Sequence, residues 1–172
     1  GNIAPQGAIF KRAAATLSLF ESEGRAVVFE NLEDLANRID DPELDITEGD
    51  IMVLKNAGPV AAGMPEAGYL PIPKKLARAG VKDIVRISDA RMSGTAFGTI
   101  VLHIAPETAR GGPLASVQTG DRIRLSVKEK SIELLVDDEE IARRLADYRA
   151  PALPPRGYRG LYARMVTQAP EG

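Results

Sequence analysis

Residues 25–30 have the sequence Arg-Ala-Val-Val-Phe-Glu and residues 50–55 have Asp-Ile-Met-Val-Leu-Lys, two short apolar runs with charged ends. Short apolar runs rich in β-branched residues are typical of buried strands. Between them, Asn31 precedes a stretch whose apolar residues recur at helical spacing, with Glu33 and Asp34 in its first turn. This arrangement predicts a helix capped by Asn31 and stabilised by acidic residues at its positive end.

Further apolar runs predict more strands on both sides of this unit. They lie at 8–11, 83–87, 99–104, 122–127 and 132–136, with another candidate at 114–117. Apolar and polar side chains alternate over 122–127, and 132–136 follows after a polar turn, which predicts an antiparallel hairpin. Helices are expected over 74–79 and after Asp137 or Asp138. Because some strands are linked by hairpins and others by helices, the sequence predicts an α/β fold with a mixed sheet or partly closed barrel.

Composition excludes several kinds of site. The chain has 172 residues with no cysteine and a single histidine, His103. Disulfides, thiolate metal sites, iron–sulfur ligation and multi-histidine metal sites within this chain are therefore excluded. The 22 basic and 24 acidic residues nearly balance, which argues against a nucleic acid or an anionic membrane as partner. No apolar run reaches the roughly 20 residues of a membrane span.

The organisation of the chain is expected to be simple. Its length fits one domain, placed at 1–150, and a cluster of proline and glycine at 151–160 marks the start of a tail over 151–172. The N-terminal residues lack the features of a signal peptide, so a cytoplasmic location is expected. They also lack an initiator methionine, which indicates an excised or processed piece of a longer protein.

Two loops follow predicted strands, at the positions where α/β proteins usually place their sites. In the first, at 56–71, Glu66 is the only charged residue between Lys55 and Lys74. A carboxylate in a rigid apolar loop is costly to bury unless it meets a cation or a donor. Glu66 is therefore either a hard-cation ligand or acid/base group, or a plain exposed or helix-capping carboxylate. Spacing alone favours the second alternative.

The second loop, at 88–95, has the sequence Ser-Asp-Ala-Arg-Met-Ser-Gly-Thr. Gly94 lets the chain turn directly after Ser93 and leaves the Ser93 hydroxyl unshielded. A serine-hydrolase triad is disfavoured, because the flanking Gly-x-Ser-x-Gly pattern is missing and His103 lies in the middle of a predicted strand.

The other polar residues of this region are expected to have structural roles. Ser88 and Thr95 are expected to bond to nearby backbone, as hydroxyls in turns commonly do. Asp89 and Arg91 are expected to form a local ion pair. His103 is expected to be a packed histidine with one nitrogen satisfied.

Several motifs, spread over nearly the whole chain, occur in the same order as in a known protein family. They are Gly1-Asn2-Ile3-Ala4-Pro5, Gly58-Pro59, Gly63-Met64-Pro65-Glu66, Ser88-Asp89-Ala90-Arg91-Met92-Ser93-Gly94, Gly111-Gly112-Pro113-Leu114, Gly120-Asp121-Arg122-Ile123 and Gly157-Tyr158-Arg159-Gly160-Leu161-Tyr162. Together they closely resemble the C-terminal domain of the dihydroxy-acid dehydratase / phosphogluconate dehydratase family. Within it, residues 89–95 look more like the sugar-acid (aldonate) dehydratases than like the branched-chain enzymes.

The resemblance implies a β-barrel-like swivelling β/β/α domain with flanking helices, and a hydro-lyase reaction. Family members remove water from a 2,3-dihydroxy acid to give a 2-keto acid, using Mg²⁺ and an iron–sulfur cluster. By motif match, Ser93 is the base that takes the C2 proton and Glu66 is a ligand of Mg²⁺. Thr95 is a candidate for orienting substrate or protonating the product, and Arg91 is a further candidate for substrate binding.

The resemblance also implies a partner. The cluster cysteines and the remaining Mg²⁺ ligands belong to an N-terminal domain, so these 172 residues are expected to be inactive alone. The full-length protein is expected to be a homodimer or a higher oligomer acting on an aldonate of the arabinonate, xylonate or gluconate type. One alternative is a dihydroxy-acid dehydratase of branched-chain amino-acid biosynthesis. Another, from a different class, is a non-catalytic binding module with the same fold.

Overall fold

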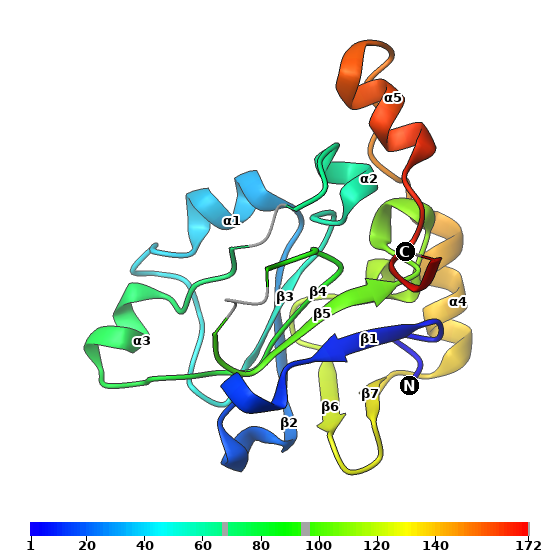
Figure 1. The fold of residues 1–172 in the computed structure, drawn as a ribbon. Coiled ribbons are helices and arrows are strands. Elements are labelled where there is room, and N and C mark those ends of the chain that lie inside the picture. The colour runs from blue at the N-terminus through cyan, green and yellow to red at the C-terminus, as the bar shows by residue number, and fades with distance from the viewer. Residues whose placement is uncertain (67–68, 94–96, 172) are drawn as a thin grey trace.

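The computed structural model describes residues 1–66, 69–93 and 97–171, which form one seven-stranded sheet with short helices around it (Figure 1). The strands are β1 (Gly7–Phe10), β2 (Glu21–Phe29), β3 (Ile51–Leu54), β4 (Arg86–Ser88), β5 (Ile100–Ala105), β6 (Arg122–Ser126) and β7 (Ser131–Leu134). The α-helices are α1 (Leu32–Arg38), α2 (Pro59–Ala62), α3 (Lys74–Arg78), α4 (Asp138–Asp147) and α5 (Gly157–Met165). Short 3₁₀ helices are η1 (Arg12–Ala14), η2 (Leu17–Leu19), η3 (Thr108–Arg110), η4 (Pro113–Ser116) and η5 (Ala169–Glu171).

The sheet is parallel in its middle and antiparallel at its edges. The strand order is β1-β5-β4-β3-β2-β6-β7, and β2, β3, β4 and β5 run in the same direction. β1 and β6 run antiparallel to their neighbours, and β7 to β6. The sheet curls into a half-barrel (Figure 1). The predicted mixed α/β fold is therefore confirmed.

Two apolar cores lie on opposite faces of the central strands. In β2 the side chains of Ala26 and Val28 join one core, and those of Val27 and Phe29 join the other. β3 alternates in the same way. Strands covered on both faces read as continuous apolar runs, which explains the pattern at 25–30 and 50–55. α4 packs on the first core, and α1 and α3 pack on the second.

Two elements predicted from local sequence signals are confirmed. Asn31 caps α1, and its Oδ1 accepts a hydrogen bond from the Asp34 N–H at 2.9 Å. The hairpin is confirmed as β6 and β7, with Ile123 opposite Leu134.

The prediction of a possible strand at 114–117 is wrong. Residues Pro113–Ser116 form the 3₁₀ helix η4, with Pro113 at its first position. The Ser116 hydroxyl closes the turn by donating to the Pro113 carbonyl at 2.8 Å. A proline at the first helical position has its φ preset and loses no hydrogen bond there, so this apolar segment is a buried turn.

The tail contacts the rest of the chain through a few residues. α5 lies against α2, and it projects beyond the other elements (Figure 1). Further on, the Thr167 carbonyl accepts from Arg91, and Gln168 bonds to Glu107. The division at 150 stays a prediction. No helix in the described part of the chain is long and apolar enough to cross a membrane.

Replacing the α1 cap should destabilise the fold measurably. Asn31→Ala leaves the Asp34 N–H without its acceptor, so we expect the free energy of unfolding to fall by about 1 kcal/mol. Urea denaturation measures it. Asn37→Ala, at an exposed position inside α1, is the matched control and should cost nothing measurable. An equal loss of unfolding free energy in both variants would contradict the capping role of Asn31.

Candidate functional site

The two loops singled out by the sequence are crossover connections over one face of the sheet. Because β3, β4 and β5 are parallel, the chain must return from the end of each strand to the start of the next. The first connection runs over 55–85 and the second over 89–99. Leu70 of the first and Met92 of the second both join the core beneath α1 and α3. The two connections therefore lie against the same face.

Glu66 and Ser93 line one cleft between these connections, with a volume of about 470 Å³. Both residues are exposed to solvent. Arg86 of β4 and Ile100 of β5 also line the cleft, from the sheet. The apolar walls come from residues of the two connections, namely Leu70, Pro71, Ile72, Met92 and Phe97. The structure thus brings together the two residues that the sequence predicts to act together.

The other two predicted site residues are placed differently. Thr95 lies outside the described residues. Arg91 is half-buried and is not part of the described cleft lining. Its Nη2 donates to the Thr167 carbonyl at 2.7 Å, so it contacts the tail.

The expected ion pair between Asp89 and Arg91 is wrong. Asp89 is 2% exposed, and its carboxylate accepts from the Ala57 N–H at 3.0 Å and the Thr108 N–H at 2.8 Å. Backbone amides from distant segments thus take the place of the neighbouring cation. Burial raises the pKa of Asp89. Asp89 joins the starts of both connections, since Ala57 belongs to the first and Asp89 to the second.

A second buried carboxyl, Glu107, lies near Asp89. It is 3% exposed and accepts from the Val60 N–H at 3.0 Å and from Gln168 Nε2 at 2.7 Å. Burial raises the pKa of Glu107, and the charge of Asp89 raises it further. The first turn of α2 and the tail are therefore held by one acidic group.

His103 supports the second connection from β5. Its backbone N–H donates to the Ala90 carbonyl at 3.1 Å, and its Nε2 accepts from the Met92 N–H at 3.2 Å. Burial lowers the pKa of His103. The packed histidine with one satisfied nitrogen is confirmed. Because Nε2 already accepts from Met92, this nitrogen is not available as the base of a serine-hydrolase triad.

Sequence reasoning missed Arg86 as a residue of the cleft. The sequence pattern places Arg86 only within the strand predicted at 83–87. The feature that could have identified Arg86 is its positive charge within an apolar run, because a charge buried in a strand needs specific partners.

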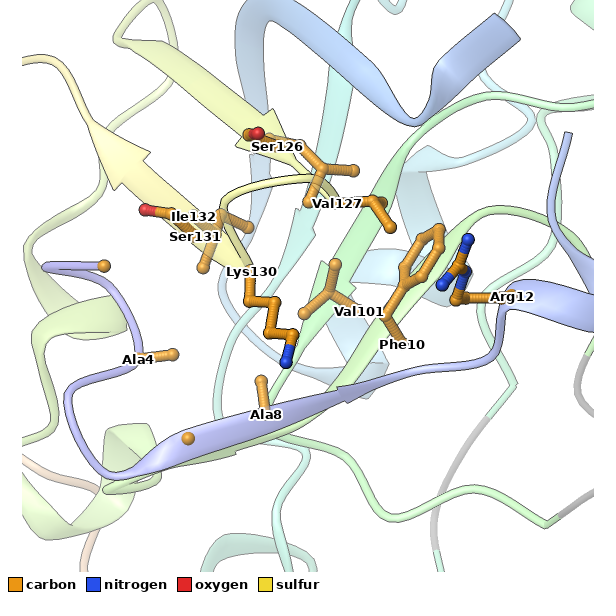
Figure 2. Close-up of a pocket in the computed structure, with 13 residues that line it drawn as sticks. Ala4, Ala8, Phe10, Arg12, Val101, Ser126, Val127, Lys130, Ser131 and Ile132 are labelled. Atoms are coloured by element: carbon orange, nitrogen blue, oxygen red, sulfur yellow. The ribbon is translucent and has the colours of Figure 1, made fainter. Parts of the chain in front are cut away.

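A second cavity, of about 340 Å³, lies between β1 and the β6–β7 turn. Figure 2 shows the Lys130 side chain extending into it toward Ala8. Its described lining includes neither Glu66 nor Ser93, and no carboxylate. This second cavity therefore does not contain the residues predicted to carry out the reaction.

Within the described ranges, no group of three or more His, Cys, Asp or Glu side chains is arranged to hold a metal ion. Glu66 offers carboxylate oxygens, the ligand type that Mg²⁺ prefers. Among the described residues, Glu66 alone would not form a metal site, and other residues would have to supply the remaining ligands.

Comparison with known proteins gives the family. The family model for the dihydroxy-acid/6-phosphogluconate dehydratase C-terminal domain matches residues 1–172. The chain belongs to this family. The resemblance of its motifs is therefore confirmed.

Curated relatives within the dehydratase family cover the whole chain. It is 51% identical to L-arabonate dehydratase of Azospirillum brasilense and 51% identical to 6-deoxy-6-sulfo-D-gluconate dehydratase of Pseudomonas putida. It is 40% identical to the dihydroxy-acid dehydratase of Acidothermus cellulolyticus. In each case the match takes in 100% of this chain but only 30–31% of the relative. The chain thus spans about a third of the length of these dehydratases.

The buried acids should make stability depend on pH. Both carboxyls have pKa values raised above the ordinary value of about 4, so their contribution is complete at low pH and is lost as pH rises through the raised values. Glu107→Gln removes one titrating group and keeps an oxygen that can accept from Val60. We expect its stability to fall less steeply than that of the wild type as the pH rises above the ordinary carboxyl pKa of about 4, measured by urea denaturation.

The exposed Glu139→Gln is the control for this series and should follow the wild-type curve. Parallel pH curves for Glu107→Gln and the wild type would contradict the assignment.

Proposed function

We propose that the chain is the C-terminal part of a hydro-lyase that dehydrates a 2,3-dihydroxy acid to a 2-keto acid. The observation that carries the proposal is the shared cleft: Ser93 and Glu66 line it together, in a chain of the dehydratase family. On this proposal the cleft is one wall of an active site. The other wall belongs to the N-terminal part that the longer relatives contain.

Ser93 is the proposed base. Its Oγ, as an alkoxide, takes the C2 proton of the substrate. A C–H beside a carboxylate is a weak acid, so the base must be strong, and a serine hydroxyl ionises only where positive charge stabilises the alkoxide. Arg86 is the one cation in the described lining, and its donors are directed to protein groups. The charge that activates Ser93 must therefore come from outside these residues.

Glu66 is the proposed metal ligand of this half. A solvent-accessible carboxylate at the cleft suits Mg²⁺, whereas a chain without cysteine offers no thiolate to an iron–sulfur cluster. When bound, the two groups supply positive charge and Lewis acidity to the cleft. The contribution of this chain is to hold one oxygen ligand and one base on the same side of the substrate.

The remaining expectations extend this proposal. Thr95 would orient substrate or protonate the product, and Arg91 would bind substrate only after leaving the Thr167 carbonyl. The partner is the N-terminal part of the same polypeptide. We further propose a swivelling attachment of this domain to that part, a homodimer or higher oligomer, and a cytoplasmic location.

An aldonate is the proposed substrate. The relatives named for sugar acids are 51% identical to the chain, against 40% for a dihydroxy-acid dehydratase. The second candidate is therefore a branched-chain dihydroxy acid. Assays of anaerobically prepared full-length protein on aldonates and branched dihydroxy acids distinguish them.

Ser93→Ala should abolish turnover in the full-length protein. The variant keeps the fold and the bound metals but has no group to take the C2 proton, so we expect a loss of at least about 1,000-fold in kcat. Product formation is measured alongside iron and magnesium content. Ser18→Ala, at an exposed serine of η2, is the matched control. Retained turnover in Ser93→Ala would remove this residue from the mechanism.

Glu66→Gln should weaken the use of Mg²⁺. The amide keeps the size of the side chain but loses its negative charge, so the Mg²⁺ concentration for half-maximal turnover should rise about tenfold or more. A titration of metal-stripped full-length protein measures it. Glu48→Gln, an exposed carboxylate that does not line the cleft, should leave the titration unchanged. An unchanged titration in Glu66→Gln would exclude Glu66 as a ligand.

A further inference from the structure

Arg86 bonds to both connections that carry the proposed chemistry. Its side chain is 6% exposed at the start of β4. Nη1 donates to the Leu70 carbonyl at 2.7 Å, and Nη2 donates to the Phe97 carbonyl at 2.9 Å. Leu70 lies four positions after Glu66, and Phe97 lies four positions after Ser93. One guanidinium thus joins the segments that follow the two functional residues.

Asp83 fixes the position of that guanidinium. Its Oδ1 pairs with Arg86 Nη2 at 3.1 Å, and both side chains are 6% exposed. Asp83 also accepts from the Thr99 N–H at 2.9 Å and from the hydroxyls of Thr99 and Thr16, each at 2.7 Å. Burial would raise the pKa of Asp83, but the bonds from Thr99 and Thr16 and the charge of Arg86 hold it below its ordinary value. Asp83 is therefore a charged and fully bonded anchor.

The space around this pair fits an arginine closely. Gly98 has a φ of +90°, and a Cβ at that position would collide with Arg86 Nη2 and with Asp83 Oδ1. A glycine next to Phe97 thus allows the backbone to approach the guanidinium. A lysine at position 86 would keep the charge but would lack the planar fork that reaches two carbonyls and a carboxylate at once.

Burying this pair adds little to stability. The desolvation of a buried ion pair offsets most of its attraction, so apolar residues of similar size often stabilise a core equally well. The distinctive property of the pair is its directed bonding to two separate segments. Directed bonds of this kind fix geometry, and errors of about 1 Å in an active site can cost about 100-fold in rate.

We propose that Arg86 is a positioning residue that sets the separation of the Ser93 hydroxyl and the Glu66 carboxylate by holding both connections at the floor of the cleft. The effect on turnover rests on the proposed function. The restraint on the two connections does not depend on it.

The test uses Arg86→Met and Arg86→Lys in the full-length protein. Amide hydrogen exchange should speed up about tenfold or more in peptides containing Leu70 and Phe97, while peptides of β2 and β3 stay protected. kcat should fall about 100-fold while KM changes less than about threefold, since the reacting groups are displaced and not removed. In Arg86→Ala, added guanidinium should restore part of kcat.

Arg144→Met is the matched control. Arg144 is also a largely buried arginine, paired with Asp121 at 2.6 Å and bonded to the Ser116 carbonyl at 3.0 Å, but it does not line the cleft. We expect it to lose stability without faster exchange at Leu70 or Phe97. If Arg86→Met fails to fold, Arg86→Lys keeps a cation beside Asp83 and carries the same measurements.

Three results would overturn the proposal: unchanged exchange in both peptides, a wild-type kcat in Arg86→Lys, or a rise in KM alone. If Ser93→Ala abolishes turnover while an Arg86 variant keeps kcat, only the positioning proposal fails. If Ser93→Ala stays active while Arg86→Met speeds exchange in both peptides, the restraint stands and the proposed chemistry is wrong.

Discussion

The parallel pairing of β3, β4 and β5 is the constraint on which the site depends. Parallel neighbours cannot be joined by a tight turn, so the chain must travel back across the sheet twice, over 55–85 and 89–99. Both faces of these strands are buried, and the two returning segments help to cover the same one. A cleft between them, bounded by Glu66 on one side and Ser93 on the other, follows from this arrangement.

Buried ionisable side chains restrain each connection at two positions. Asp89 lies at the start of the second connection and binds the Ala57 N–H of the first. Arg86 binds Leu70 in the middle of the first connection and Phe97 near the end of the second. These groups are satisfied by protein donors and acceptors, so their burial does not leave unpaired charge. Glu66 and Ser93 lie between the restrained positions, so they can stay exposed without being freely placed. Fixed supports beneath accessible groups are what a preorganised site requires.

The sequence predicted features that depend on local pattern or on shared motifs. Alternation identified the β6–β7 hairpin, and the Asn31 cap identified α1, because each is decided within a few residues. The pairing of Glu66 with Ser93 came from the family resemblance, since no spacing rule joins residues on separate loops.

Features set by contacts between distant segments were not predicted. Proximity along the chain suggested Arg91 as the partner of Asp89, whereas its observed partners are the amides of Ala57 and Thr108. Arg86 was missed for the same reason, because its partners at positions 70 and 97 meet it only after the sheet has formed. The apolar run at 114–117 resembled a strand, but the proline before it starts a 3₁₀ turn.

The charge of the cleft explains why this half would need its partner. Its described lining contributes one carboxylate, Glu66, and one guanidinium, Arg86, whose charge is already paired with Asp83. The described lining thus supplies no cation beyond one already paired, and an alkoxide at Ser93 would need positive charge nearby. On the proposed chemistry, the serine stays a weak base until cations held by the remainder of the polypeptide reach the cleft. A base that gains its strength only on assembly would not deprotonate solutes beforehand, so the division of the site between two domains would itself restrict when the reaction occurs.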